Sequence, residues 1–297
     1  MIINATNLQA ASKGFRALYR EEMAKASSVH QTLAMVIESS SPEENYAFLK
    51  ALPRMREWLG DRVVHGLEAA GFTIRKKDWE ATIAVDRDEI LFDKLNLVRP
   101  RIQELARAAQ AHYMDLLVDL LAEGFARECY DGQYFFDEDH PVGGASVSNK
   151  GVAPLSGDAY EAAYAAMQAV KDDAGKPLGV RPTHLVVPPQ LRGMGKRILE
   201  ADLLEGETNV NKGSAELLVL PELAGHPKKW FLLDLSRPLK PFILQVVKQP
   251  DFVALDRPDD EGAFRRREFL YGVDCIDNAG YGLWQLAWGS TGEGSGT

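Results

Sequence analysis

The sequence predicts an α+β protein in which one long helix precedes a lobe of alternating helices and strands. A single amphipathic pattern runs from Pro100 to about Arg127, interrupted only by Gly124. Helical and strand-like patterns then alternate from residue 157 to about 249, and residues 264–288 are strand-like. The chain has 297 residues, 45% of them hydrophobic and 26% charged, which is typical of folded protein and enough for one large domain or two modest ones.

The first 50 residues or so are expected to form an arm. Small and polar residues dominate positions 4–13, a helix is expected from Ser12 to about Lys25, and residues 39–42 (SSSP) form a break. Large apolar residues are few for this length. We therefore expect the arm to pack on a partner and not to form a core of its own.

Two short β-like runs follow, and together they predict a hairpin. They cover Phe72–Arg75 and Ala81–Val85, and Ala81, Ile83 and Val85 alternate with Thr82 and Ala84. A short helix is expected before them, at about residues 63–70. The hairpin carries many charges, and an isolated two-stranded hairpin is marginally stable at best. It should therefore lie on another surface.

The long helix is the clearest element. Pro100 suits a first helical turn, and apolar side chains recur at spacings of three and four from Ile102 to Leu121. At 1.5 Å per residue the helix should be ~40 Å long. Asp115, Asp119 and Glu123 follow one another at spacings of four on the opposite face, where like charges repel. This row should be well solvated or face basic groups.

The rest of the chain predicts shorter elements. Helices are expected at about 160–170 and 188–201, strands at 184–187, 217–220, 230–235 and 242–247, a turn at 278–280, and a disordered tail from Ser290.

Residues Asp137, Glu138, Asp139 and His140 are the most tempting group for chemistry, because carboxylates and histidine can bind a metal. Four ligands in one unbroken run rarely point at one centre, however, so a turn stabilised by bonds to backbone N–H groups is the favoured interpretation. Cys129, near His140, is a weaker nucleophile candidate, and both cysteines, Cys129 and Cys275, are expected to be buried free thiols. No nucleotide-binding glycine motif and no G-x-S-x-G elbow occurs. We therefore expect no cofactor and no enzyme, with a metal-dependent hydrolase using Asp137 to His140 as the distant alternative.

The net charge of −9 disfavours a protein that wraps nucleic acid, because phosphate contacts need lysine and arginine. The same sign suits a protein that must lie near nucleic acid without adhering to it. The chain shows no signal-peptide pattern and no apolar run of membrane-spanning length. We therefore expect a soluble protein made in the cytoplasm, with no membrane partner.

Four runs resemble, in order, the major head subunit (T protein) of Mu-like phages. They are WLGDRVV (58–64), FTIRKKDWEATIAVDRDEI (72–90), YDGQYFFDEDHP (130–141) and YGVDCIDNAGYGLWQLAWGSTG (271–292). The resemblance spans about residues 45–292 and implies the Hong Kong 97-like phage major capsid fold. It implies an N-terminal arm (1–54), an extended loop that includes the hairpin (55–97), a peripheral domain with the long spine helix (98–153), an axial domain (154–249), return strands of the peripheral domain (250–292) and a disordered tail (293–297).

The resemblance also implies a function and partners. Such a subunit assembles with itself, through hexamers and pentamers, into the icosahedral virion shell that encloses double-stranded DNA without sequence-specific binding. A scaffold or maturation protease, a portal and decoration proteins are the other expected partners, and assembly is expected in the host cytoplasm. No Lys–Asn pair with a nearby acid is identifiable, so we expect a non-covalent shell. An encapsulin-like compartment is the main alternative.

Charged side chains are the candidates for contacts between subunits, since charge pairing sets register more than strength. Basic groups of the hairpin and of the run before the last strands should meet acidic groups of neighbouring copies. The candidates are Arg75, Lys76, Lys77, Asp86, Asp88, Asp115, Asp119, Arg265, Arg266 and Arg267.

Overall fold

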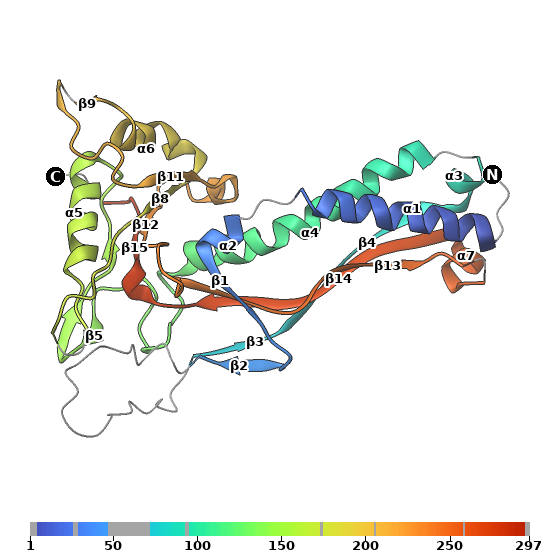
Figure 1. Cartoon of the computed structure of the whole chain (residues 1–297), viewed down its shortest axis with the longest axis horizontal. Helices are drawn as coiled ribbons and strands as arrows, with labels where there is room; N and C mark the ends of the chain where they lie inside the picture. The colour runs from blue at the N-terminus through green and yellow to red at the C-terminus, as the bar shows by residue number, and fades with distance from the viewer. Residues whose placement is uncertain are drawn as a thin grey trace.

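The computed structural model describes residues 5–25, 29–46, 72–92, 95–172, 175–204, 206–257 and 259–294. The molecule has an elongated half, with a long helix lying along a long sheet, and a compact half at the other end (Figure 1). We use these two names below. The expected mixture of helices and strands is therefore confirmed, and the long helix dominates the shape.

A four-stranded sheet with the order β1-β13-β14-β4 forms the base of the elongated half. β13 (Phe242–Leu255) and β14 (Glu268–Tyr281) pair antiparallel over almost their whole lengths. β1 (Ala34–Glu38) joins β13 in parallel, and β4 (Lys77–Asp86) joins β14 on the opposite edge. The two long strands run from the compact half to the far end, so they connect the two halves (Figure 1).

α4 (Leu95–Glu123) lies along this sheet, and α1 (Ala5–Met23) packs on α4. At 1.5 Å per residue the 29 residues of α4 span about 43 Å, close to the expected length. The apolar faces of both helices meet the sheet in one buried cluster. Its largest members are Leu8, Phe15, Tyr19, Ile102, Leu105, Phe252, Phe269 and Tyr271. α2 (Val29–Leu33), α3 (Arg87–Leu91) and α7 (Glu261–Arg266) are short helices at the ends of strands.

The compact half contains a five-stranded sheet with the order β11-β8-β12-β15-β7. In chain order its strands are β7 (Lys150–Gly151), β8 (His184–Val187), β11 (Glu216–Val219), β12 (Trp230–Leu233) and β15 (Ala287–Ser290). α5 (Gly157–Ala169) begins where the Ser156 hydroxyl accepts a hydrogen bond from the Ala159 N–H. The other helices are η2 (Pro189–Leu191), α6 (Arg192–Leu199), η3 (Pro221–Gly225) and η4 (Trp284–Leu286). Most of the elements predicted for residues 157–249 are confirmed.

Three two-stranded pairs complete the described fold. β2 (Glu43–Asn45) pairs with β3 (Thr73–Arg75), β5 (His140–Val142) with β6 (Ala145–Val147), and β9 (Leu203–Leu204) with β10 (Glu207–Thr208).

The predicted hairpin of Phe72–Arg75 with Ala81–Val85 is wrong. β3 pairs with β2, whereas β4 pairs with β14 from Asp86–Glu268 to Lys77–Asp277. The alternation within β4 is real, because Val85 is buried and Thr82 is exposed, but the surface it faces is supplied by the elongated half of the same chain. The predicted helix at 63–70 lies outside the described residues.

Three further expectations are corrected. The N-terminal helix finds its packing partner within its own chain, since Leu8, Phe15 and Tyr19 are buried against α4 and the long sheet. Pro100 lies inside α4, so the helix begins earlier than expected and lacks the backbone hydrogen bond that this residue would donate. Residues 278–280 continue β14 and form no turn.

Candidate functional site

The predicted basic residues of the first charged run lie where β3 ends and β4 begins: Arg75 and Lys77 are exposed and Lys76 is half-buried. Arg75 Nε is 3.2 Å from a carboxylate oxygen of Glu43, and Lys76 Nζ is 3.1 Å from Asp78. Lys77 Nζ lies 5.8 Å from the centroid of a Trp79 ring. Exposed pairs of this kind contribute at most about 1 kcal/mol, so these cations are available to exchange partners.

The second basic run was expected at the start of a strand, and it lies instead at the end of α7, directly before β14. Arg265 pairs with Glu261 at 3.2 Å and Arg266 with Glu268 at 3.6 Å. Arg267 ends the helix with a left-handed backbone conformation, φ 61°, and pairs with Asp88 at 3.0 Å. Of the predicted opposite-charge pairs, the structure therefore brings Arg267 and Asp88 together within one chain.

Asp86 has a structural role beside that pair. Its carboxylate accepts a hydrogen bond from the Asp88 N–H at 2.6 Å and caps α3 in a capping box with Glu89.

The acidic row on α4 faces solvent, as expected. Asp115 and Asp119 are exposed and have no ion-pair partner among the described residues, whereas Glu123 pairs with Arg127 at 2.6 Å. The pKa of Asp115 is raised, first by partial burial and then by the negative charge of Glu222 on η3, with Asp119 adding to it. The structure therefore presents an acidic surface, made of Asp115, Asp119 and Glu222, that a neighbouring cation would stabilise.

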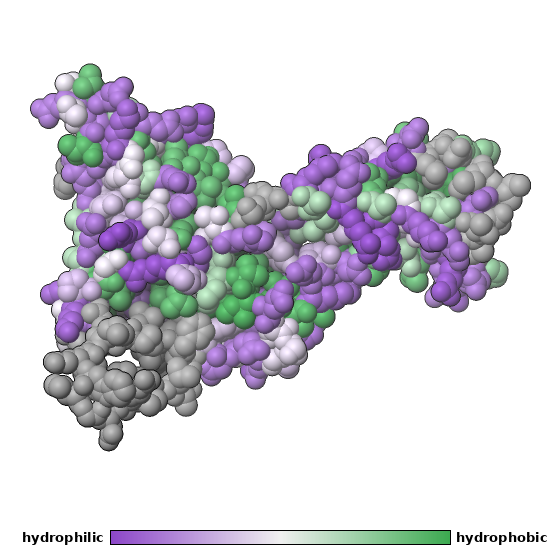
Figure 2. All heavy atoms as spheres, viewed as in Figure 1, coloured by the Kyte–Doolittle hydropathy of each residue, from purple (hydrophilic) through white to green (hydrophobic). Residues whose placement is uncertain are grey.

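Exposed apolar side chains gather on the elements at the far end of the elongated half, a feature that the sequence analysis missed. Phe92 follows α3, Leu97 lies in the first turn of α4, Leu255 ends β13 and Phe264 lies on α7. Phe264 is 85% exposed and Phe92 is 66% exposed. Figure 2 shows apolar residues at this end and also where the two halves join, between largely hydrophilic surfaces. Exposed apolar side chains grouped in this way mark interaction surfaces.

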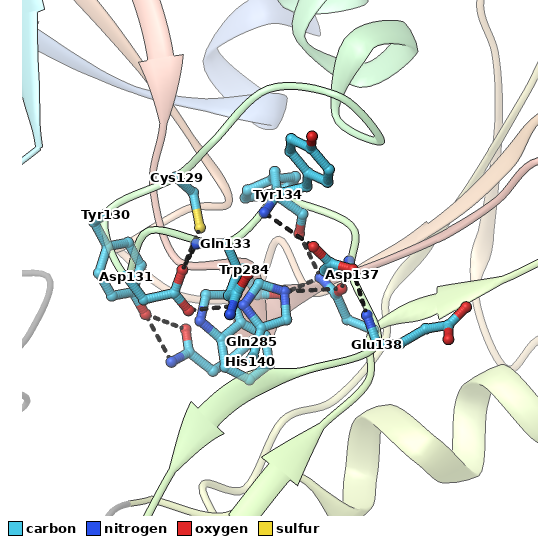
Figure 3. A network of polar contacts seen from close by, with 12 residues as sticks. Cys129, Tyr130, Asp131, Gln133, Tyr134, Asp137, Glu138, His140, Trp284 and Gln285 are labelled. Atoms are coloured by element: carbon cyan, nitrogen blue, oxygen red, sulfur yellow. Dashed lines mark hydrogen bonds and ion pairs between the residues drawn. The ribbon is translucent and has the colours of Figure 1, made fainter.

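The cluster at Asp137 to His140 does not converge on one centre (Figure 3). The Asp137 carboxylate accepts hydrogen bonds from the Tyr134 N–H at 3.1 Å and the Glu138 N–H at 2.8 Å. Glu138 and Asp139 are exposed, whereas His140 is fully buried. The expected bonds from backbone N–H groups are therefore present at Asp137, but the run is an irregular stretch that leads into β5 and not a turn.

His140 instead belongs to a buried network that the sequence analysis did not assemble (Figure 3). Its Nδ1 is 2.7 Å from an oxygen of Asp131, its Nε2 is 3.1 Å from Asn149 Oδ1, and its ring stacks on Trp284 at 3.9 Å. Asn149 Nδ2 donates to the Phe135 carbonyl, so Asn149 Oδ1 is the atom that faces His140 Nε2, and both ring nitrogens of His140 are engaged by protein groups. The ring thus has no nitrogen free for a metal.

Cys129 joins the same network as a donor. Its Sγ donates to Asp131 at 3.0 Å, and burial, followed by the Asp131 charge, raises the pKa of the thiol far above its usual range. Burial opposes ionisation of Asp131, but hydrogen bonds from His140 and Cys129 outweigh it and lower the pKa of that carboxyl. A protonated buried thiol is a poor nucleophile, which argues against a catalytic role for Cys129. The network instead holds the loop after α4 in place.

Comparison with known proteins decides between the remaining interpretations. The family model described as Mu-like prophage major head subunit gpT matches residues 8–153, 146–223 and 222–295. The chain belongs to this family. The major capsid protein of Escherichia phage Mu is 29% identical over 287 residues, which cover 97% of this chain and 74% of that protein. The Mu-like prophage FluMu major head subunit of Haemophilus influenzae is 31% identical over 274 residues, which cover 92% and 70%.

Solved structures agree with the family. A chain of the bacteriophage JBD30 procapsid has 31% identity and a TM-score of 0.64, covering 99% of this chain and 77% of its own length. A chain of the JBD30 capsid has 27% identity and a TM-score of 0.58, covering 75% and 100%. A phage-related protein from Bordetella bronchiseptica shares the fold at 13% identity and a TM-score of 0.56.

The Mu-like head subunit is thus a major capsid protein with the Hong Kong 97-like fold. Its relatives are structural proteins of phage heads, which selects this function over both the encapsulin-like and the hydrolase alternatives. None of the helices that the structure describes has the length and apolar character needed to cross a membrane.

Proposed function

We propose that this head subunit assembles through hexamers and pentamers into a non-covalent icosahedral shell around double-stranded DNA. The observation that carries the proposal is the match of almost the whole chain to a procapsid subunit, 99% of its length at a TM-score of 0.64. The acidic chain, with a net charge of −9, can enclose DNA without binding its sequence.

The shape of the subunit supports assembly by many weak contacts. The subunit presents ion pairs near its surface at β3 and the start of β4, the acidic surface on α4 and exposed apolar side chains at the far end of its elongated half. Each such contact is weak, but a subunit that makes several of them at once is held far more tightly than any one contact would hold it.

We assign residues 98–153 and 250–292 to the peripheral domain and residues 154–249 to the axial domain. In support, α4 and most of β14 lie in the elongated half, whereas α5 and α6 belong to the compact half. Residues 1–54 are assigned to the arm and 55–97 to the extended loop. Residues 47–71 lie outside the described residues, and so do 295–297 of the proposed tail at 293–297.

The further partners that we propose are a scaffold or maturation protease, a portal and decoration proteins. One solved relative is the capsid of bacteriophage JBD30 decorated with minor capsid protein trimers. We place assembly in the host cytoplasm and the product in the virion.

Charge reversal tests the contacts between subunits. We expect the cations Arg75, Lys76, Lys77 and Arg265 to Arg267 to meet Asp86, Asp88, Asp115 or Asp119 of neighbouring copies. The variant Lys76→Glu/Lys77→Glu should assemble less completely and only at higher salt, because its new charges repel those acids.

Adding Asp115→Lys and Asp119→Lys to that variant should restore assembly if these groups face each other. Lys13→Glu, which changes an exposed lysine on α1 outside the predicted set, is the control. Electron microscopy and sedimentation over a range of NaCl concentrations provide the measurement. Normal shells with unchanged salt tolerance in the Lys76→Glu/Lys77→Glu variant would contradict the proposed contacts.

A further inference from the structure

A second buried polar cluster lies between the long helix and the long sheet. His112 comes from α4, and Cys275 and Asp277 come from β14. The two strand residues are separated by one position, so their side chains project from the same face of the sheet. The Asp277 side chain is fully buried, and that of His112 is 16% exposed.

Contacts fix these side chains in place. His112 Nε2 lies 2.8 Å from Asp277 Oδ1. The Trp79 ring packs against the imidazole at 4.7 Å between centroids, and Trp79 Nε1 donates to the Asp277 backbone carbonyl at 3.3 Å. The indole thereby shields the cluster at the edge of the sheet.

The cluster leaves buried polar atoms unsatisfied. Among the residues that the structure describes, neither Asp277 Oδ2 nor the Tyr113 hydroxyl has a hydrogen-bond partner. A buried polar atom without a partner costs about 1–3 kcal/mol, and such atoms call for a specific explanation such as a bound ion.

We propose that His112, Cys275 and Asp277 bind one zinc ion between α4 and β14. Their ligand atoms all lie within 4.8 Å of one another. Two ligand atoms on tetrahedral zinc are about 3.3–3.6 Å apart, given bonds of about 2.0–2.3 Å. The His112–Asp277 contact of 2.8 Å would open slightly and the thiol would move to the same spacing, with water as the fourth ligand.

The choice of metal follows from the donor set. An imidazole nitrogen, a thiolate and a carboxylate suit zinc, whereas magnesium and calcium prefer oxygen alone. Binding would release the Cys275 thiol proton to solvent, and the charge of the zinc ion would neutralise the buried Asp277 carboxylate.

The other cysteine cluster is a matched contrast. Cys129, Asp131 and His140 also lie within ligand distance of one another, but both ring nitrogens of His140 already contact protein groups, Asp131 and Asn149. No atom of that cluster is left unsatisfied in the described part of the chain. We therefore place the zinc ion at Cys275 and not at Cys129.

Zinc at this position would fasten α4 to β14. Unlike the contacts between copies, this clamp acts within one subunit. It goes beyond the shell-forming function and does not depend on it.

Equilibrium dialysis of the purified full-length protein against Zn²⁺, followed by elemental analysis, tests the site. We expect one zinc ion per chain, with a stoichiometric loss in Cys275→Ser and in His112→Gln and full retention in Cys129→Ser. Co²⁺ should give a thiolate charge-transfer absorption in the near ultraviolet with the wild type and with Cys129→Ser, but not with Cys275→Ser.

Circular dichroism verifies that each variant is folded. If Cys275→Ser does not fold, His112→Gln still tests the site, because it alters the partly exposed ligand. Zinc should also raise the unfolding temperature of the wild type and leave that of His112→Gln unchanged. Binding far below one ion per chain in the wild type overturns the proposal. Retention of wild-type zinc binding by both Cys275→Ser and His112→Gln, or a loss confined to Cys129→Ser, overturns it as well.

Discussion

Phe15 tests whether the N-terminal helix belongs to the core of its own subunit. Its side chain is 3% exposed and meets the Tyr271 ring edge-on, with 5.1 Å between centroids. Leu8, Tyr19 and Phe252 belong to the same buried cluster. The substitution Phe15→Ala therefore removes a ring from the middle of this cluster and leaves a cavity between α1 and the sheet.

The magnitude follows from burial. Truncation of a buried phenylalanine to alanine costs about 3–5 kcal/mol, which includes the lost aromatic contact. Phe264→Ala removes the same atoms from a side chain that is 85% exposed. This matched control should change the free energy of unfolding by less than about 0.5 kcal/mol.

Urea unfolding of the disassembled subunit, followed by far-ultraviolet circular dichroism, measures both values. Phe15→Ala should lower the midpoint strongly with little change in slope. Phe264→Ala should keep the midpoint and weaken assembly, because its ring lies on a surface that we expect other copies to cover. A loss below about 1 kcal/mol for Phe15→Ala, or equal losses for the two variants, would refute the packing of α1 as part of the subunit core.

Three further predictions concern charge and backbone. Asp115→Asn should raise the free energy of unfolding at pH 7, because the raised pKa of Asp115 means that ionisation is opposed in the folded state. Solvent screens this exposed side chain, so the gain should not exceed the value for a like-charge helix pair, about 0.2–0.5 kcal/mol. The gain should vanish below about pH 4, where aspartate is protonated in both states, and an unchanged midpoint at pH 7 would contradict it. The pKa of Asp131 is lowered, so the stability that this carboxylate contributes is present above about pH 4 and is lost as the pH falls through the folded pKa. Asp131→Asn should therefore lower the free energy of unfolding by about 1–3 kcal/mol at pH 7. A difference between variant and wild type that stays constant down to pH 2 would be inconsistent with this pH dependence. Gly282→Ala places a Cβ against a backbone carbonyl oxygen and should lower the free energy of unfolding by about 1–3 kcal/mol. Gly14 has open space beside it on α1, so Gly14→Ala should raise that free energy by about 0.5–1 kcal/mol, as measured by thermal unfolding. Similar values for the two variants would argue against the close approach at Gly282.

Local periodicity predicted individual elements well and their partners poorly. α4 and the strand at His184–Val187 were predictable because each has a clear apolar pattern of its own. The hairpin prediction failed because alternation specifies which face of a strand is buried and not which strand it pairs with. β4 pairs with residues 268–277, far away in the sequence.

In the candidate site, too, features that depend on a local pattern were predictable and contacts between distant segments were not. The exposure of Asp115 and Asp119 was predictable from their spacing on the helix, but the contact of Asp88 with Arg267 joins distant segments. The link between Cys129 and His140 required Asp131, which carries no pattern of its own in the sequence. The exposed rings of Phe92 and Phe264 were missed because exposure at a chain reversal depends on the tertiary fold.

Single-particle electron cryomicroscopy of the particles formed by the purified full-length chain, alone and after coexpression with a scaffold protein, tests the central claim most directly. The account predicts closed icosahedral shells, or the hexameric and pentameric rings that build them. Within these, the far end of the elongated half, including Phe264, should be covered by other copies, and α1 should lie on the long helix of its own subunit. A chain that remains monomeric under all these conditions, or that forms one small closed oligomer with Phe264 open to solvent, would contradict it.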